Sequence, residues 1–130
     1  MKKLLAAGLA LLTTTLPLRA ATLEEALAAP GRPAADLQRD QRDRPAAIIA
    51  LLEIGPGDRV ADIFGGAGYY SELVAGVVAP GGEVLLHNNQ AYLDYVAEGL
   101  KSRFAGRSVE GVVRHDREPD NLDLGEDTLD

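Results

Sequence analysis

Short apolar runs alternate along the chain with segments whose apolar residues recur every three or four positions. The runs cover residues 59–64, 83–87 and 109–115, and such runs are typical of strands buried on both faces. Helical spacing predicts one helix at about 70–78 and another at about 91–104. Because strands alternate with helices, we expect an α/β fold, a Rossmann-like parallel sheet with flanking helices and right-handed crossovers.

Two shorter helices are expected nearer the N-terminus. Thr22 and Glu25 form a capping-box pattern that predicts one of them. Pro45 suits the first turn of a second helix, which continues to Leu52. Between the two, segment 36–44 alternates acidic and basic residues. This segment is interpreted either as a solvated linker or exposed helix face, or as a flap over a cofactor site.

The N-terminus has the layout of a secretory signal peptide. Lys2 and Lys3 precede an uncharged apolar stretch at 4–16, and small residues follow Pro17. The stretch is shorter than the roughly 20 residues that span a bilayer. The pattern predicts a signal peptide at 1–21, export to the periplasm and no stable membrane span after cleavage. The alternatives are an uncleaved anchor or an ordinary helix, and a leader that does not function would leave the protein in the cytoplasm.

Charge and composition exclude several classes of function. The formal net charge is −7, and removing the leader, with three basic and no acidic residues, gives −7 − 3 = −10. A binder of nucleic-acid backbones carries a basic face, so we expect no nucleic-acid partner. The chain has no cysteine and two histidines. We therefore expect no disulfide, no thiol nucleophile and no metal site.

The richest local pattern is a glycine turn between the first predicted strand and the helix after it. Gly65, Gly66 and Gly68 fall within four residues. Glycines let the backbone approach a ligand, and the free N–H groups of a helix start favour polar or anionic atoms. A dinucleotide fingerprint that starts at Gly66 has Ser71 where its last glycine should be, so the match to an NAD site is weak. The Gly-Lys-Ser/Thr end of a phosphate-binding loop is absent, which argues against a mononucleotide site.

The residues from Val60 to Gly68 resemble motif I of the class I S-adenosylmethionine-dependent methyltransferases. The family pattern is apolar, apolar, acid, apolar, then Gly-x-Gly-x-Gly, and Phe64 stands here in place of the first glycine. The aromatic residue, the glycine turn and the following 69–73 are similar to a branch of predicted methyltransferases that often carry signal peptides. The resemblance covers about 39–130 and includes Pro45 and the turns at residues 56–60 and 80–82.

The resemblance implies a cofactor, S-adenosylmethionine, and a role for each motif position. Gly66 and Gly68, with Gly65 and Ala67 between and beside them, would approach its methionyl part. Asp62 would hold the loop and the cofactor's amino group, while Tyr69 would wall the pocket. Asn88 stands where the family has an acid for the ribose hydroxyls, although an amide offers one carbonyl acceptor and no charge. Asp116 would face the adenine amino group. The positions assigned to the cofactor are therefore Asp62, Phe64, Gly65, Gly66, Ala67, Gly68, Tyr69, Asn88 and Asp116.

Several of these residues also have a structural interpretation. Asp62 alone is able to cap the glycine turn, Asn88 fits any strand-to-helix turn, and Asp116 is an acid in a polar loop. His87 and His115 lie at strand ends and are interpreted as structural residues rather than general bases.

The expected organisation is a signal peptide at 1–21, an N-terminal helix and charged linker at 22–44, and the N-terminal half of a methyltransferase domain at 45–130. The expected function is methyl transfer to a small-molecule or protein acceptor. Alternatives are an NAD-type Rossmann domain and a non-catalytic relic of the fold. The fourth strand would begin at Asp130, which leaves the first strand unpaired on one side, so we expect this fragment alone to be inactive. The sequence assigns no catalytic residue and no oligomeric state.

Overall fold

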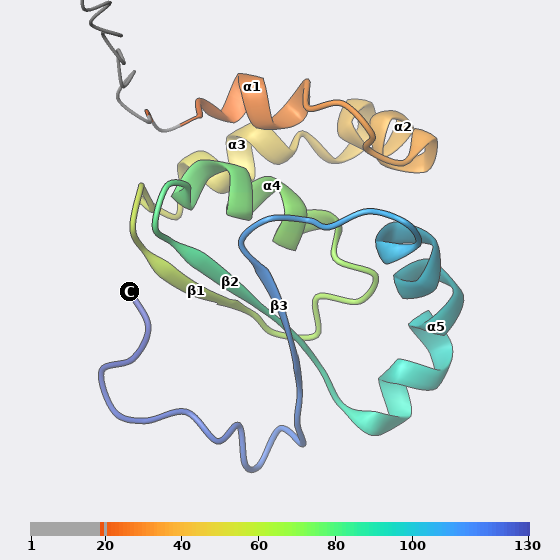
Figure 1. The fold of residues 1–130 in the computed structure, drawn as a ribbon, viewed down its shortest axis with the longest axis vertical. Coiled ribbons are helices and arrows are strands. Elements are labelled where there is room, and N and C mark those ends of the chain that lie inside the picture. Colours follow the sequence, from red (N-terminus) through yellow and green to blue (C-terminus); the bar gives the residue numbers. More distant parts are fainter. Residues whose placement is uncertain (1–18, 20) are drawn as a thin grey trace, which may run out of the picture.

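The computed structural model describes Arg19 and residues 21–130, so almost all of the predicted signal peptide lies outside the described residues. Within the described part, no helix is both long and apolar enough to cross a membrane. The elements, shown in Figure 1, are α1 (Leu23–Leu27), α2 (Ala34–Asp43), α3 (Pro45–Ala50), β1 (Arg59–Asp62), α4 (Tyr69–Val78), β2 (Glu83–Asn88), α5 (Gln90–Phe104) and β3 (Val112–Asp116).

The three strands form one parallel sheet in the order β1-β2-β3. The register pairs Asp62 with Leu86, and Asn88 with Asp116, so the carboxyl ends of the strands lie along one edge. Each connection between neighbouring strands contains a helix, as parallel pairing requires. The predicted fold class is confirmed: this is an α/β structure with a three-stranded parallel sheet flanked by helices, consistent with an incomplete Rossmann-like fold.

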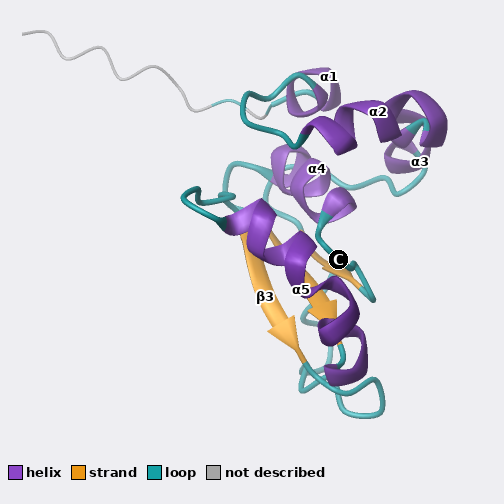
Figure 2. Ribbon diagram, turned by 90° about the vertical axis from the view of Figure 1, so that its right-hand side faces the viewer, coloured by secondary structure: helices purple, strands orange, loops and turns teal. Residues whose placement is uncertain are grey.

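Helices α4 and α5 pack on one face of the sheet and form the hydrophobic core with it. Val84 and Leu86, two residues apart on β2, point to the same face of the sheet. Val84 packs in a cluster with Leu73 and Val78 of α4, and Leu86 packs with residues of α5 that include Leu100. Figure 2 shows α5 running alongside the sheet. Both helices therefore cover the face that carries the even-numbered residues of β2, and Asn88 belongs to this face.

The loop after β3 is attached to the opposite face and to the free edge of β1. Two carbonyls of this loop lie within hydrogen-bond distance of the histidines at the strand ends, at 2.9 Å for His87 and 2.6 Å for His115. At the edge, the N–H of Asp130 donates to the carbonyl of Arg59 at 3.0 Å, and the N–H of Arg59 donates to the carboxylate of Asp130 at 2.9 Å. The chain therefore returns to β1 on the side that β2 does not occupy (Figure 1).

Two strands are shorter than predicted, for local reasons. β1 ends at Asp62 instead of residue 64, because Phe64 has a φ of 54°, in the left-handed region that interrupts a strand. β3 begins at Val112 instead of residue 109. The N–H of Val112 donates to the carbonyl of Val109, and Gly111 has a φ of 78°. The residues predicted to begin this strand therefore form a turn.

The N-terminal segment is folded onto the sheet domain. The capping box predicted at Thr22 is present, with Glu25 accepting from the N-cap backbone at 2.7 Å. α1 then packs closely on α4, where a Cβ on Gly76 would lie 2.7 Å from the Cβ of Ala26. The charged segment is a helix, α2, and one side of it is exposed while Asp36 on the other side is buried.

Candidate functional site: the pocket at the glycine turn

The turn between β1 and α4 depends on glycines for two different reasons. A Cβ on Gly65 would lie 2.6 Å from a carboxylate oxygen of Asp62 and from a methyl carbon of Leu86, so the backbone passes directly over both side chains. Gly66 and Gly68 instead have φ values of 63° and 85°, which glycine adopts without strain. Gly68 also serves as the N-cap of α4. The turn therefore holds the chain close to the end of β1.

A pocket of about 290 Å³ lies beside this turn. It brings together six of the nine predicted cofactor residues, namely Asp62, Phe64, Gly65, Gly66, Ala67 and Tyr69. The remaining lining comes from residues outside the predicted cofactor positions, namely Asp36, Arg39, Tyr70, Tyr92, Val96 and Arg103. A larger and more open hollow of about 650 Å³ between α5 and Arg114 of β3 is lined mainly by carbon atoms.

Asn88 does not line the pocket, because its side chain is fully buried and engaged. Its amide oxygen accepts from the N–H of Gly66 and its amide nitrogen donates to the carbonyl of Gly66, both at 3.0 Å. The two bonds fix the glycine turn to the end of β2. Neither the amide oxygen nor the amide nitrogen of Asn88 is therefore left to bind a ribose. The side chain of the following residue, Asn89, is occupied as the N-cap of α5. The position predicted to meet a ribose therefore holds the turn in this structure.

Asp116 lies apart from the pocket as well. It forms an ion pair with Arg114 two residues away on β3 and lines a separate hollow beside Glu118. Gly68 is buried behind the turn, where a Cβ would meet Leu86 at 3.0 Å and the side chain of Arg103 at 3.3 Å. The structure therefore gathers the turn and Asp62 around one hollow and leaves the two more distant predicted positions outside it.

The main-chain N–H groups of the three glycines are already bonded within the protein. Gly65 donates to the carbonyl of His87, Gly66 to Asn88, and Gly68 to the carbonyl of Gly65, at 3.0 Å in each case. The glycines thus shape the pocket, but they do not supply free donors to it.

Asp62 is the acidic group at the floor of the pocket. The hydroxyl of Ser71, in the first turn of α4, donates to its Oδ2 at 2.7 Å. Asp62 therefore ties the end of β1 to the first turn of α4. Burial raises the pKa of the Asp62 carboxyl, while the hydrogen bonds from Ser71 and the charge of Arg39 oppose that rise. A buried carboxylate that lines a hollow favours a cationic partner.

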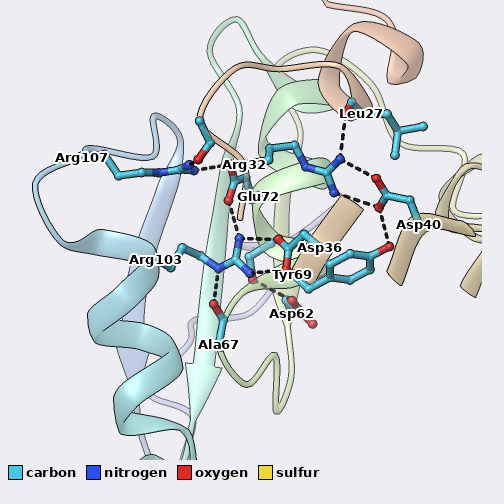
Figure 3. A network of polar contacts seen from close by, with 12 residues as sticks. Leu27, Arg32, Asp36, Asp40, Asp62, Ala67, Tyr69, Glu72, Arg103 and Arg107 are labelled. Carbon is cyan, nitrogen blue, oxygen red and sulfur yellow. Dashed lines mark hydrogen bonds and ion pairs between the residues drawn. The ribbon is translucent and has the colours of Figure 1, made fainter. Parts of the chain in front are cut away.

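Arg103 joins α2 to the glycine turn, as Figure 3 shows. Its buried guanidinium donates from Nε to the carbonyl of Ala67 and pairs through its terminal nitrogens with Asp36 of α2 and Glu72 of α4. Arg107, which follows the end of α5, also pairs with Glu72. Three helices and the turn therefore meet at a single buried cation.

A second set of contacts fastens α2 at Asp40 (Figure 3). Arg32 donates to both carboxylate oxygens of Asp40, at 2.7 and 2.9 Å, and the hydroxyl of Tyr69 donates to the same carboxylate at 2.8 Å. The hydrogen bonds from Arg32 lower the pKa of Asp40 against the effect of burial. Burial and the bond to Asp40 raise the pKa of Tyr69. Tyr69 lines the pocket as predicted, with its hydroxyl turned toward α2.

The aromatic side chains at the pocket form part of its wall. The ring of Phe64 is 44% exposed and meets His87 and Tyr92 edge-on, with ring centroids 5.3 and 6.0 Å away. The N–H of Phe64 donates to Nδ1 of His87 at 3.3 Å, so the other ring nitrogen donates to the carbonyl of Arg117. His87 is thus a structural link between turn and loop, in agreement with its interpretation from sequence.

The residues from α2 and α5 that line the pocket were not predicted, because they lie far from the glycine turn in the sequence. Arg39 and Asp36 belong to the charged segment, for which a flap over a cofactor site was one of two interpretations, and no spacing rule connected them with the glycine turn. Arg103 lies 67 residues from Asp36, and its position on α5 gives no sign that it is buried. Among the described residues, no group of three His, Cys, Asp or Glu is arranged to hold a metal ion.

The pocket fits one end of S-adenosylmethionine better than the other. Two carboxylates and two arginines line the hollow. Asp36 and Arg103 pair with each other, and the remaining two, Asp62 and Arg39, match the charges of an amino-acid moiety. At the nucleoside end, the side chain that the family uses for the ribose is replaced by Asn88, whose amide is occupied by Gly66. The volume of about 290 Å³ is also near the lower limit for a small-molecule pocket. The charges and the size of the hollow are therefore complementary to a free amino-acid end.

A scan against protein-family models found no match for this chain, and a search of curated proteins found no similar sequence.

Proposed function

We propose that residues 45–130 form the cofactor-binding part of an S-adenosylmethionine-dependent methyltransferase that acts on a small-molecule or protein acceptor. The observation that carries this proposal is the pocket at the carboxyl end of β1, formed by the glycine turn and lined by Asp62. In open α/β sheets, ligands bind beyond the carboxyl ends of the strands. The resemblance of residues 60–68 to motif I supports the choice of cofactor.

When bound, S-adenosylmethionine would supply a methyl group on a sulfonium sulfur: the acceptor's lone pair bonds to the methyl carbon in line with the C–S bond, and the sulfur leaves with the electrons of that bond. The chain's own contribution is to bind and orient. Asp62 would accept hydrogen bonds from the ammonium group, and the ring of Phe64 would wall the hollow from solvent. Orientation of the two reacting groups is itself a large part of catalysis in such a reaction.

Isothermal titration of the chain with S-adenosylmethionine, S-adenosylhomocysteine and NAD tests this proposal. We expect the two sulfur compounds to bind and NAD not to bind. Asp62→Asn should weaken binding about tenfold or more, because a charge-assisted hydrogen bond contributes about 1.5–3 kcal/mol. Asp120→Asn is the matched control, since its exposed carboxylate lies outside the pocket and outside the predicted cofactor positions, and it should leave the affinity unchanged. Binding of NAD alone, or sensitivity to Asp120→Asn but not to Asp62→Asn, would contradict the proposal.

A non-catalytic domain that retains only the pocket is the second candidate. The observation that favours it is the engagement of Asn88 by Gly66, which leaves no side chain at that position for a ribose. Methyl transfer from S-adenosylmethionine to any acceptor by the chain in a cell extract, measured with a labelled methyl group, would exclude this candidate.

We also propose that residues 1–21 direct export, which would place the pocket in the periplasm, whereas S-adenosylmethionine is expected in the cytoplasm. A fusion of residues 1–30 to an enzyme that is active only outside the cytoplasm tests the leader. An active fusion supports export. An inactive fusion would show that the leader does not function, and the protein would then meet the cofactor where it is expected.

A further inference from the structure

The side chain of Arg39 reaches the pocket from α2, which is not part of the motif-like stretch. Its guanidinium carbon lies 4.0 Å from the ring centroid of Tyr69 and 5.6 Å from that of Tyr70. All three residues line the same pocket as Asp62. Cation–π contacts with the two rings help to hold the guanidinium at the pocket wall.

Arg39 differs from the other arginines of this region in the nitrogen atoms that it leaves available. Its Nε donates to Asp43 at 2.6 Å, and within residues 21–130 no hydrogen bond engages its two terminal nitrogens. By contrast, Arg32 binds Asp40 through both terminal nitrogens, and Arg103 is bonded through Nε and both terminal nitrogens. The pocket wall therefore presents one guanidinium edge with unused donors.

Asp62 supplies the opposite charge in the same hollow. Only one of its carboxylate oxygens accepts the Ser71 hydroxyl, and the residue is not fully buried. The positive charge of Arg39 acts on the Asp62 carboxyl, since it is among the influences that lower its pKa. No direct ion pair joins Arg39 and Asp62 within the described residues; each pairs elsewhere. The two opposite charges thus share one pocket without neutralising each other.

We propose that Arg39 binds the α-carboxylate of an amino-acid moiety while Asp62 binds its ammonium group, so that the pocket selects ligands with a free amino-acid end. This inference rests on the proposed function, which supplies the ligand, and adds a residue from α2 to its binding site. Terminal guanidinium nitrogens match the geometry of a carboxylate, and the zwitterion satisfies both protein charges at once.

The anchoring of α2 explains how a residue outside the sheet domain is positioned for this task. Asp36 is held by Arg103, and Asp40 is held by Arg32 and by Tyr69. Arg39 lies between these two anchors on the same helix. A guanidinium fixed in this way loses less conformational freedom when a ligand binds than one on a flexible loop would.

The test compares S-adenosylmethionine with decarboxylated S-adenosylmethionine, which lacks only the carboxylate, by titration against the full chain. The wild-type chain should bind the carboxylate-bearing compound about ten- to hundredfold more tightly, the range expected for a charge-assisted contact. Arg39→Gln should reduce this preference to near onefold without changing the affinity for the decarboxylated compound. Arg39→Lys should keep part of the preference, because the charge remains but the planar fork is lost.

Arg42→Gln is the matched control, because Arg42 lies on the same helix and also pairs with Asp43 but does not line the pocket. It should leave the preference as in the wild type. Thermal melting followed by circular dichroism shows whether Arg39→Gln remains folded, and Arg39→Lys provides the same test if it does not.

The outcomes separate the two proposals. If the wild type binds both compounds equally, or if Arg39→Gln retains the preference, the role of Arg39 is wrong while cofactor binding stands. If the wild type binds neither compound, the proposed function fails and this inference fails with it.

Discussion

Replacing Asn88 with aspartate distinguishes two opposite roles for the end of β2. If the side chain faced a ribose, an acid there would restore the feature that the methyltransferase resemblance implies and would tighten binding. In the structure the amide is instead fully buried, and it donates to and accepts from Gly66 at 3.0 Å. An ionised aspartate keeps the acceptor but turns the donor into a second acceptor, which faces the carbonyl of Gly66.

The size of the effect follows from these two contacts. A charged carboxylate in place of the amide would leave the Gly66 carbonyl unsatisfied, which costs about 1–3 kcal/mol, with a further penalty for burying the charge. A protonated carboxyl is able to reproduce both bonds, but protonation at pH 7 of a group with a pKa of about 3.9 costs about 4 kcal/mol. We therefore expect Asn88→Asp to lower the free energy of unfolding by about 2–4 kcal/mol at pH 7.

The sign of the pH dependence is a second part of this prediction. The folded state would raise the pKa of the introduced carboxyl, so the variant should recover stability as the pH falls toward the unfolded value near 4. Urea unfolding followed by far-ultraviolet circular dichroism at pH 7 and pH 5 measures both effects. Asn89→Asp is the control, because the same chemical change at an N-cap is close to neutral.

Two results would refute this reasoning. One is an Asn88→Asp variant that is as stable as the wild type at pH 7. The other is a variant that binds S-adenosylmethionine more tightly than the wild type, since that would place the side chain in the ligand site and not on the glycine turn.

Three further predictions concern the turn and the charged contacts. Gly65→Ala should lower the free energy of unfolding by about 1–3 kcal/mol in urea titrations, because its Cβ would lie 2.6 Å from two side chains, while Gly55→Ala, with open space around it, should be nearly neutral. The folded state lowers the pKa of Asp40. The ionised carboxylate therefore stabilises the fold above about pH 4, and this contribution is lost as the pH falls further. The difference in melting temperature between wild type and Asp40→Asn should shrink in acid. Arg103→Met should cost about 3–5 kcal/mol by thermal melting, because it leaves buried Asp36 without its ion-pair partner, whereas exposed Lys101→Met should be silent.

The order of the elements was predictable from the sequence, because local patterns decide it. The apolar run at residues 83–87 became β2, and the helical spacing at residues 70–78 became α4, each within one residue of the predicted bounds. Glycine and proline clusters separate these segments, and turn residues act locally. The end of β1 was not predictable in the same way, since an apolar Phe64 fits a strand pattern although its backbone is left-handed.

The glycine turn and Asp62 were also predictable, whereas the partners that complete the pocket were not. The turn was predictable because its residues are neighbours in the sequence. The contacts that bring α2 to the turn join residues as far apart as Asp36 and Arg103, and no periodicity connects them. Asn88 shows the same limit, because its sequence position fits a ligand contact, and only the packing of the turn against β2 reveals that its amide is occupied.

The stability of the site and its proposed task act in opposite directions at Asp62. Burial raises the pKa of this carboxyl, so the ionised form that would bind an ammonium group is disfavoured in the folded chain. Because the folded pKa is raised, the destabilisation is present above the folded value and is relieved as the pH falls. Conflicts of this kind are typical of binding sites, where a ligand supplies the missing charge.

We propose that the hollow beside the glycine turn holds the methionyl end of S-adenosylmethionine. The most direct measurement is a titration of the isotope-labelled chain with S-adenosylhomocysteine, followed by two-dimensional NMR of the backbone amides. The amides of Ala67 and Tyr69 and those around Arg39 should shift together as the ligand saturates, while those in the loop around Asp120 should stay in place. Shifts confined to the end of β3, or no shifts at millimolar ligand, would contradict the claim.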